Sequence, residues 1–199
     1  MRRRVVVTGI GCVTPLGTRP EALWENLLAG KSGVRRVAEL EAGDFPTKIA
    51  AEVRDWSIAD DGEDEATWAD RSKHTRFAAG AARQAVDDSG LLGSVPPDRL
   101  GIYLGAGEGQ QDFFRFAQMM VQATRDGEFN LKEFVAAGLQ VLEPKAELEQ
   151  EPNMPAAYLA GMIDAQGPNM NCLTACAASS QAIGEAAEII RRGEADAML

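Results

Sequence analysis

The chain has 199 residues, 45% of them hydrophobic, and a formal net charge of −10. This length and composition are typical of a globular protein with one sizeable core. The excess of acidic side chains argues against general nucleic-acid binding, which needs a basic face, and no apolar run reaches the roughly 18 residues of a membrane-spanning helix. Three cysteines without paired spacing and a single histidine predict a reducing, cytoplasmic location with neither a disulfide framework nor a metal site.

The amino-terminal pattern predicts a strand, a loop and a helix. Val5–Thr8 is an apolar run of the kind found in a buried strand, and glycine and proline mark Gly9–Gly17 as a tight loop. Thr18, with Glu21 three residues later, matches a capping box at a helix start, and Gly30 is expected to end that helix.

Gly9 and Gly11 in this loop invite comparison with the dinucleotide-binding motif Gly-x-Gly-x-x-Gly. The third glycine is replaced by Thr14, and Pro15 follows it. The motif therefore fails here, and no cofactor is predicted.

The middle of the chain continues to alternate between helices and strands. Residues 31–70 are mixed and polar, and the acidic run 60–65 within them reads as a solvated loop. Helices are expected over residues 72–89 and 113–121, with a strand over residues 100–104 between them.

The last third of the chain completes this pattern. Residues 128–150 are amphipathic and acidic, residues 153–165 have the composition of a buried helix, and residues 195–199 resemble the start of another strand. Strands that alternate with helices predict an α/β fold with a parallel or mixed sheet in a layered arrangement.

Cys176 stands where a strand is expected to turn into a helix. Residues 170–174 read as a short buried strand, and an apolar face then recurs at spacings of three and four residues. That face consists of Ala178, Ala182, Ile183, Ala186, Ile189 and Ile190. Arg191 and Arg192, followed by Gly193, are typical of a helix end.

A helix start suits a nucleophilic cysteine. Unpaired backbone N–H groups and the positive end of the helix dipole favour a thiolate there, and the thiolate is the reactive form. Position alone leaves a second interpretation open, because a small buried cysteine often does no more than pack a strand–helix junction.

Four blocks of the sequence resemble the β-ketoacyl-acyl-carrier-protein synthases, in the order that this family has them. The first comprises residues 4–17 (RVVVTGIGCVTPLG) and 24–33 (WENLLAGKSG), the second residues 76–91 (RFAAGAARQAVDDSGL), and the third residues 99–107 (RLGIYLGAG). The fourth, residues 167–196, carries the Thr-Ala-Cys triplet of the active-site block, then Ala-Ile-Gly and an Arg-x-Gly-x-Ala-Asp run.

The resemblance implies the thiolase-like fold, in which two similar halves layer helices and sheets as α-β-α-β-α. Because the family's chains are considerably longer, residues 1–199 would supply only the amino-terminal half. They would be either a fragment or a natural half that a second polypeptide completes. The implied reaction is a decarboxylative Claisen condensation of an acyl thioester on Cys176 with malonyl-acyl carrier protein, in fatty-acid, polyketide or polyene biosynthesis.

By the same resemblance, the partners are an acyl carrier protein and a second ketosynthase-type subunit, in a homodimer or heterodimer. The two histidines and the lysine that assist decarboxylation belong to the family's second half, and His74 does not match them. We expect Arg71 and Lys73 to dock the acidic carrier protein. Cys12 and Cys172 are interpreted as structural.

Glu108 stands where elongating synthases usually carry an apolar residue near the end of the acyl pocket. A buried carboxylate is costly unless it is paired or protonated, so Glu108 would shorten or polarise that pocket. The alternative is that it faces solvent or the subunit interface. Residues 128–150, in the region that shapes the pocket and the dimer contact, have no family counterpart that we recognise.

Three other functions remain open. A non-catalytic subunit of the chain-length-factor kind shares the fold but typically lacks the cysteine. A thiolase acting on acyl-coenzyme A matches the sequence blocks less well. A cysteine hydrolase would need a histidine in a believable partner position, which the sequence does not offer.

Overall fold

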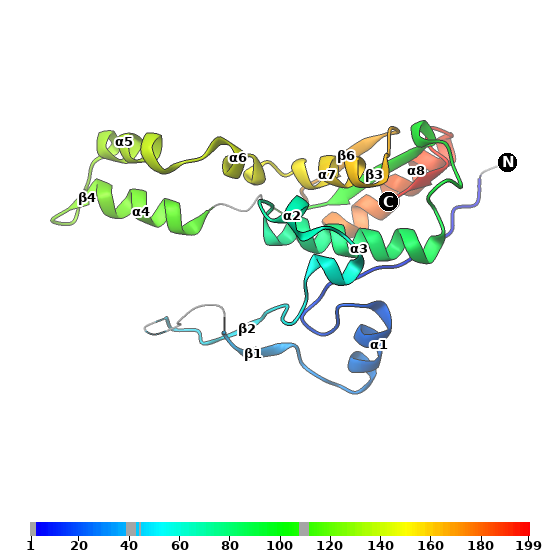
Figure 1. Cartoon of the computed structure of the whole chain (residues 1–199), viewed down its shortest axis with the longest axis horizontal. Coiled ribbons are helices and arrows are strands. Elements are labelled where there is room, and N and C mark those ends of the chain that lie inside the picture. The colour runs from blue at the N-terminus through cyan, green and yellow to red at the C-terminus, as the bar shows by residue number, and fades with distance from the viewer. Residues whose placement is uncertain (1–2, 39–42, 44, 108–111) are drawn as a thin grey trace.

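The computed structural model describes residues 3–38, 43, 45–107 and 112–199. At its centre lies a parallel sheet in the order β6-β3-β7, in which β3 (Leu100–Gly105) runs between β6 (Asn169–Cys172) and β7 (Ala197–Met198) (Figure 1). Ile102 of β3 pairs with Asn169 of β6 in the register. Parallel neighbours need long crossover connections, and helices supply them here.

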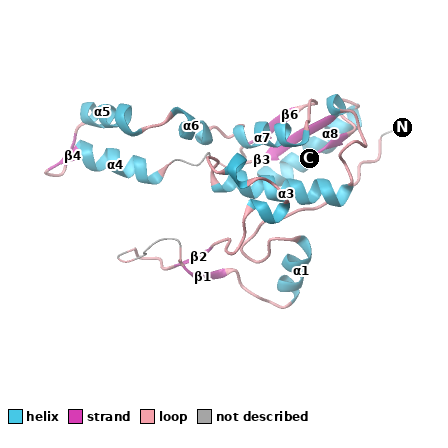
Figure 2. Cartoon of the chain, in the orientation of Figure 1, coloured by secondary structure: helices cyan, strands magenta, loops and turns pink. Residues whose placement is uncertain are grey.

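Helices cover both faces of this sheet (Figure 2). On one face, α3 (Lys73–Ser89) and α7 (Met154–Ile163) share a core with β3. That core consists of Ala79, Ala82, Val86, Leu100, Ile102, Ala156, Leu159 and Ile163, together with Ile58 and Trp68. On the other face, α8 (Ala178–Arg192) packs against Tyr103 and Cys172. Because side chains alternate across a strand, β3 is buried from both sides, and the predicted layered α/β arrangement is confirmed.

Several elements match the sequence closely. The helix predicted over residues 72–89 is α3, the strand predicted over residues 100–104 is β3, and α7 lies within the helix predicted over residues 153–165. The one-turn helix η2 (Pro97–Arg99) precedes β3. α8 ends at Gly193, whose φ of 79° is left-handed, as the sequence predicts for a glycine at that position.

The strand before Cys176 is less buried than the sequence predicts. Asn169 and Met170 of β6 are exposed, and only Cys172 is buried. The reason is topological: β6 is an edge strand, and no other strand among the described residues pairs with its outer side.

The residues before α3 form a helix and a β-hairpin. In chain order these elements are α1 (Pro20–Leu28), the antiparallel strands β1 (Val34–Arg36) and β2 (Ile49–Ala51), η1 (Ile58–Asp61) and α2 (Glu65–Trp68). Thr18 does not cap α1, contrary to the prediction. Arg19 occupies the N-cap position and makes no side-chain capping bond, because Pro20 sets the helix start one residue later.

A helical hairpin projects from the body of the molecule (Figure 1). It comprises α4 (Phe113–Ala123), the short antiparallel strands β4 (Thr124–Arg125) and β5 (Glu128–Phe129), and α5 (Leu131–Val141). We call residues 113–141 the arm. Phe134 of α5 packs against α4: the centre of its ring lies 6.1 Å from that of Phe116 and 5.6 Å from that of Phe129. α6 (Pro144–Glu147) and η3 (Leu148–Gln150) lead from the arm back to α7.

The predicted strand Val5–Thr8 is not a strand in the structure. The segment is unpaired, with Val6 59% and Val7 75% exposed. An apolar run becomes a buried strand only where a neighbouring strand offers a hydrogen-bonding ladder, and none of the described strands does so here. The chain directly after this segment lies against α3, since a Cβ at Gly9 or Gly11 would lie about 2 Å from a backbone oxygen of that helix.

The chain exposes more surface than a compact protein of its mass. Its accessible surface is 12656 Å², whereas a compact 21.3 kDa monomer is expected to expose about 9,100 Å². Much of the excess is apolar side chains on the arm, on α1 and on the segment before Gly9. Clustered exposed apolar side chains of this kind are typical of surfaces that contact further protein.

Candidate active site

Cys176 lies between β6 and α8, as the sequence predicts. Ala175–Ala177 form the one-turn helix η4, which runs directly into α8. Cys176 is exposed, whereas Cys172 is buried and Cys12 is half-buried. Of the chain's three thiols, only that of Cys176 lies open to a substrate.

The residue before Cys176 has a strained backbone. Ala175 has a φ of 50°, in the left-handed region that costs a residue with a Cβ about 1–2 kcal/mol. This turn carries the chain abruptly from β6 into η4 and places Cys176 in the first helical turn. Within this turn the backbone N–H of Ala177 donates to the carbonyl oxygen of Thr174 and that of Ala178 donates to Ala175. The N–H of Cys176 itself is therefore the helix-start donor placed to stabilise a negative charge that develops beside the sulfur.

Contacts from the sheet hold this junction in place. The Cys172 thiol donates to the carbonyl oxygen of Ala178 at 3.3 Å, which is the structural role predicted for Cys172. Gly105, at the end of β3, lies so close that a Cβ on it would be 2.5 Å from the carbonyl carbon of Ala178. The Thr174 hydroxyl donates to Oε1 of Gln181 at 2.9 Å and ties the turn to the second turn of α8.

Cys12 is a poor nucleophile by comparison. Burial raises the pKa of its thiol, and the nearby carboxylates of Glu21 and Asp61 raise it further. A raised pKa keeps the thiol protonated at neutral pH, and the thiolate is the reactive form. Its position in the loop before α1, with Sγ 3.9 Å from the carbonyl oxygen of Gly17, agrees with the structural interpretation.

The residues predicted to dock a carrier protein lie at the start of α3. Nη1 of Arg71 donates to the Tyr158 hydroxyl at 3.1 Å, the guanidinium lies 4.1 Å from the centre of that ring, and Oε1 of Glu149 is 3.7 Å from Nη1. Lys73 is the first residue of α3 and is exposed. Docking of a carrier protein by Arg71 and Lys73 stays a prediction. The guanidinium of Arg71 is already bonded to Tyr158 and lies beside Glu149 within the chain. Glu108 lies outside the described residues.

His74, the only histidine, sits half-buried in the first turn of α3, where its Nδ1 is 3.1 Å from the Ser72 hydroxyl. Within the ranges that the structure describes, no group of three His, Cys, Asp or Glu side chains is arranged to hold a metal ion. No helix in those ranges is long and apolar enough to cross a membrane.

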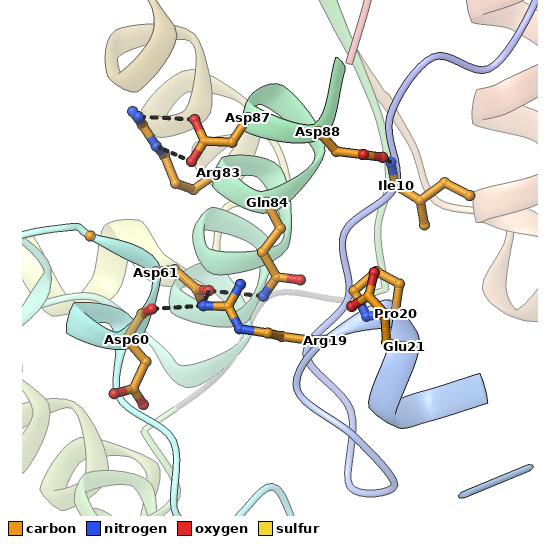
Figure 3. Close-up of a pocket in the computed structure, with 11 residues that line it drawn as sticks. Ile10, Arg19, Pro20, Glu21, Asp60, Asp61, Arg83, Gln84, Asp87 and Asp88 are labelled. Atoms are coloured by element: carbon orange, nitrogen blue, oxygen red, sulfur yellow. Dashed lines mark hydrogen bonds and ion pairs between the residues drawn. The ribbon is translucent and has the colours of Figure 1, made fainter. Parts of the chain in front are cut away.

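A polar hollow of about 460 Å³ lies between α1, η1 and α3 (Figure 3). Its buried carboxylate is Asp61, which accepts from Nε1 of Trp56 at 2.9 Å and from Nε2 of Gln84 at 3.0 Å, and which lies 3.2 Å from Nη2 of Arg19. The prediction of a solvated loop over residues 60–65 is therefore wrong at Asp61. Three donors offset the desolvation of its carboxylate, so it can be buried.

Two carboxylates at the rim of the hollow, Asp87 and Asp88, are also paired. Figure 3 shows Arg83 bound to Asp87 through both side-chain oxygens, at 3.0 and 3.1 Å, and Asp88 accepting from the backbone N–H of Ile10 at 3.0 Å. Because these groups satisfy one another, we assign the hollow to the packing of α1 and η1 on α3 rather than to the active site.

The chain is similar to known proteins over its whole length. The family model described as "Beta-ketoacyl synthase, N-terminal domain" matches residues 2–199. The chain belongs to the β-ketoacyl synthase family. Among curated relatives, it is 35% identical to 3-oxoacyl-acyl-carrier-protein synthase 2 of Coxiella burnetii, over 100% of this chain and 45% of that one, and 32% identical to the enzyme of the same name from Staphylococcus aureus, over 99% and 44%.

Solved structures of β-ketoacyl synthases show the same fold. The ishigamide ketosynthase/chain length factor superposes with a TM-score of 0.76 at 26% identity, over 98% of this chain and 46% of that one. A β-ketoacyl synthase from Burkholderia phymatum gives 0.72 at 25% identity, over 98% and 45%. The thiolase-like fold implied by the sequence blocks is thereby confirmed. The chain spans about half the length of these β-ketoacyl synthases.

Two residues that shape the junction were missed in the sequence. Gly105 falls just beyond the strand predicted over residues 100–104, whereas it ends β3 and allows α8 to approach the sheet. The left-handed backbone of Ala175 has no sequence signal, because alanine is not a residue that favours that region. The run of small residues around Cys176 was the available hint of close packing.

Proposed function

We propose that, in the complete protein, Cys176 is the nucleophile of a β-ketoacyl synthase. Its sulfur attacks the thioester of an acyl-carrier protein, forms an acyl thioester on Cys176 and releases the carrier thiol. Malonyl-carrier protein then loses carbon dioxide, and the resulting enolate attacks the acyl carbonyl carbon. The new carbon–carbon bond forms as the Cys176 sulfur leaves, so 3-oxoacyl-carrier protein is released and the cysteine is regenerated.

The observation that carries this proposal is the exposed thiol of Cys176 at the strained start of α8, within a domain that belongs to the family. The described residues supply the nucleophile and the backbone N–H of Cys176, which would be one of the donors that stabilise the tetrahedral oxyanion. By the family resemblance, two histidines and a lysine from the second half would carry decarboxylation. The presence of three free thiols fits the cytoplasmic location expected from the sequence.

We propose an acyl carrier protein and a second ketosynthase-type subunit as the partners. One neighbouring structure is described as a type II PKS acyl-carrier protein in complex with its ketosynthase, and it superposes with a TM-score of 0.70 at 25% identity. The arm supports a subunit contact, because apolar side chains recur along one face of α5 and are exposed: Leu131 66%, Val135 53% and Leu139 84%.

The alternative is a non-catalytic subunit of the chain-length-factor kind. The ishigamide neighbour is described as a ketosynthase/chain length factor, so similarity of fold does not distinguish a catalytic subunit from a chain length factor. The exposed thiol of Cys176 favours the catalytic subunit, because a subunit without turnover has no use for a nucleophile at this position.

Acyl transfer to Cys176 tests the proposal. The protein, in its complete length, is incubated with an acyl-carrier protein and digested, and the acylated peptide is identified by mass spectrometry. We expect the acyl group on Cys176, no acylation in Cys176→Ala, and unchanged acylation in Cys12→Ser. Acylation that survives Cys176→Ala overturns the nucleophile assignment. Acylation without release of 3-oxoacyl product when malonyl-carrier protein is added would favour the non-catalytic alternative.

A further inference from the structure

We propose that Glu149 is a positioning residue that clamps the base of the arm to the body and thereby sets the direction in which the arm projects. Glu149 belongs to η3, in the return connection from α5 to α7, where the sequence has no counterpart that we recognise in the family. The clamp is a property of this chain's own contacts. It holds whether or not the proposed condensation takes place.

The first observation is the burial of a charged side chain. Glu149 is only 4% exposed. Its Oε2 accepts from the backbone N–H of Ser72 at 3.0 Å and from the hydroxyl of Thr75 at 3.1 Å. Arg71 lies beside the other oxygen, with Nη1 3.7 Å from Oε1. A carboxylate is buried this deeply only when its partners offset the loss of water.

The second observation is that this carboxylate caps α3 from another part of the chain. Ser72 is the N-cap residue of α3, and its own side chain makes no capping bond. Glu149 therefore accepts one of the unpaired N–H groups at the helix start, where the helix dipole also favours a negative charge. Burial would raise the pKa of Glu149, but the hydrogen bonds from Ser72 and Thr75 outweigh it and lower the pKa. The clamp is thus ionised at neutral pH.

The third observation is how the arm is attached. α4 and α5 pack chiefly on each other, and the arm extends away from the sheet (Figure 1). Its return connection reaches the body through α6 and η3, and Glu149 is where this connection is bonded to α3. Tyr158 of α7 lies under the guanidinium of Arg71 and joins the same cluster. One carboxylate therefore links the arm's base to two helices of the core.

Two measurements on the complete protein test the clamp. The distance between spin labels at Lys132→Cys on the arm and Glu185→Cys on α8, both exposed positions, is measured in a Cys176→Ser background. Hydrogen exchange of the backbone amides is measured in parallel without labels. The variant is Glu149→Gln, and the matched control is Glu151→Gln, which alters an exposed carboxylate two residues away.

We expect Glu149→Gln to broaden or shift the distance distribution and to accelerate exchange in the first turn of α3 and in residues 142–150 by about tenfold or more, since a hydrogen bond to a charged group is lost. Exchange in β3 and α8 should stay unchanged, and Glu151→Gln should stay within about twofold of the wild type throughout.

An unchanged distance distribution in Glu149→Gln, with no more than a lower melting temperature, would show that Glu149 stabilises the fold without directing the arm, and would overturn the proposal. If Glu149→Gln does not fold, Thr75→Val replaces it, because this near-isosteric change removes one donor of the clamp. The same broadening, smaller in extent, is then expected, and its absence overturns the proposal equally.

Discussion

At Gly105 the sheet closely approaches the start of α8, the helix that directly follows Cys176, so we predict that Gly105→Ala disturbs the proposed active site directly. A Cβ at this position would lie 2.5 Å from both the carbonyl carbon of Ala178 and the backbone nitrogen of Ser179. Non-bonded carbon atoms rest about 3.5 Å apart. The obstacle is backbone rather than a flexible side chain, so the start of α8 must move by about 1 Å.

This displacement should affect stability and reactivity together. Forcing a methyl group into a packed site typically costs about 1–3 kcal/mol of unfolding free energy. A misplacement of about 1 Å in a catalytic group can lower a rate about 100-fold. We therefore expect Gly105→Ala to slow acyl transfer to Cys176 by up to about two orders of magnitude and to lower the urea midpoint.

The control for this prediction is Gly184→Ala, also a glycine-to-alanine change but on the open face of α8. No atom lies within 4 Å of a Cβ at Gly184, and alanine is favoured over glycine inside a helix by about 0.5–1 kcal/mol. Gly184→Ala should raise stability slightly and leave the acylation rate unchanged. If Gly105→Ala acylates Cys176 at the wild-type rate, β3 does not position the nucleophile and the reasoning is refuted, whatever happens to stability.

Two further predictions concern buried and paired carboxylates. Asp61→Ala leaves the donors of Trp56 and Gln84 unsatisfied, so the unfolding free energy should fall by about 3–5 kcal/mol. A loss below about 1 kcal/mol in denaturant titrations would contradict the hydrogen bonds assigned to Asp61. Hydrogen bonds from Arg99 hold the pKa of Asp196 at about 2, below the usual 3.8 of an aspartate. This carboxylate therefore contributes stability above pH 3.8 that is lost as the pH falls toward 2. In Asp196→Asn the melting temperature should fall less steeply over this pH range than in the wild type. Identical dependence of the melting temperature on pH in the two proteins would refute the contribution of the Asp196 carboxylate.

Elements with strong local signals could be predicted from the sequence. α3 and α8 carry regular apolar faces, and each ends at a glycine, Gly90 or Gly193, whose left-handed φ the sequence itself suggests. The position of Cys176 at a strand–helix junction follows from the same signals. Local periodicity and helix-end chemistry need no knowledge of distant partners, which is why these predictions succeed.

Features that depend on distant partners could not be predicted. Glu149 is buried because of Ser72, which lies 77 residues away in the chain, and Asp61 is buried because of Gln84, 23 residues away. The Val5–Thr8 segment fails as a strand for the same reason, since its state depends on whether a neighbouring strand is present. Whether a short acidic or apolar run is exposed or buried can therefore be predicted only when its tertiary partners are known.

Several independent constraints meet at the turn that carries Cys176. Ala175 is held in a left-handed backbone conformation that is unfavourable for alanine. Gly105 leaves room for α8 to approach the sheet, and the Cys172 thiol donates a hydrogen bond to the first residue of α8. A turn that served packing alone could relax this strain by a small shift of α8, or by glycine in place of Ala175. Strain that the surrounding structure maintains, next to the one exposed thiol of the chain, is what a preorganised nucleophile requires.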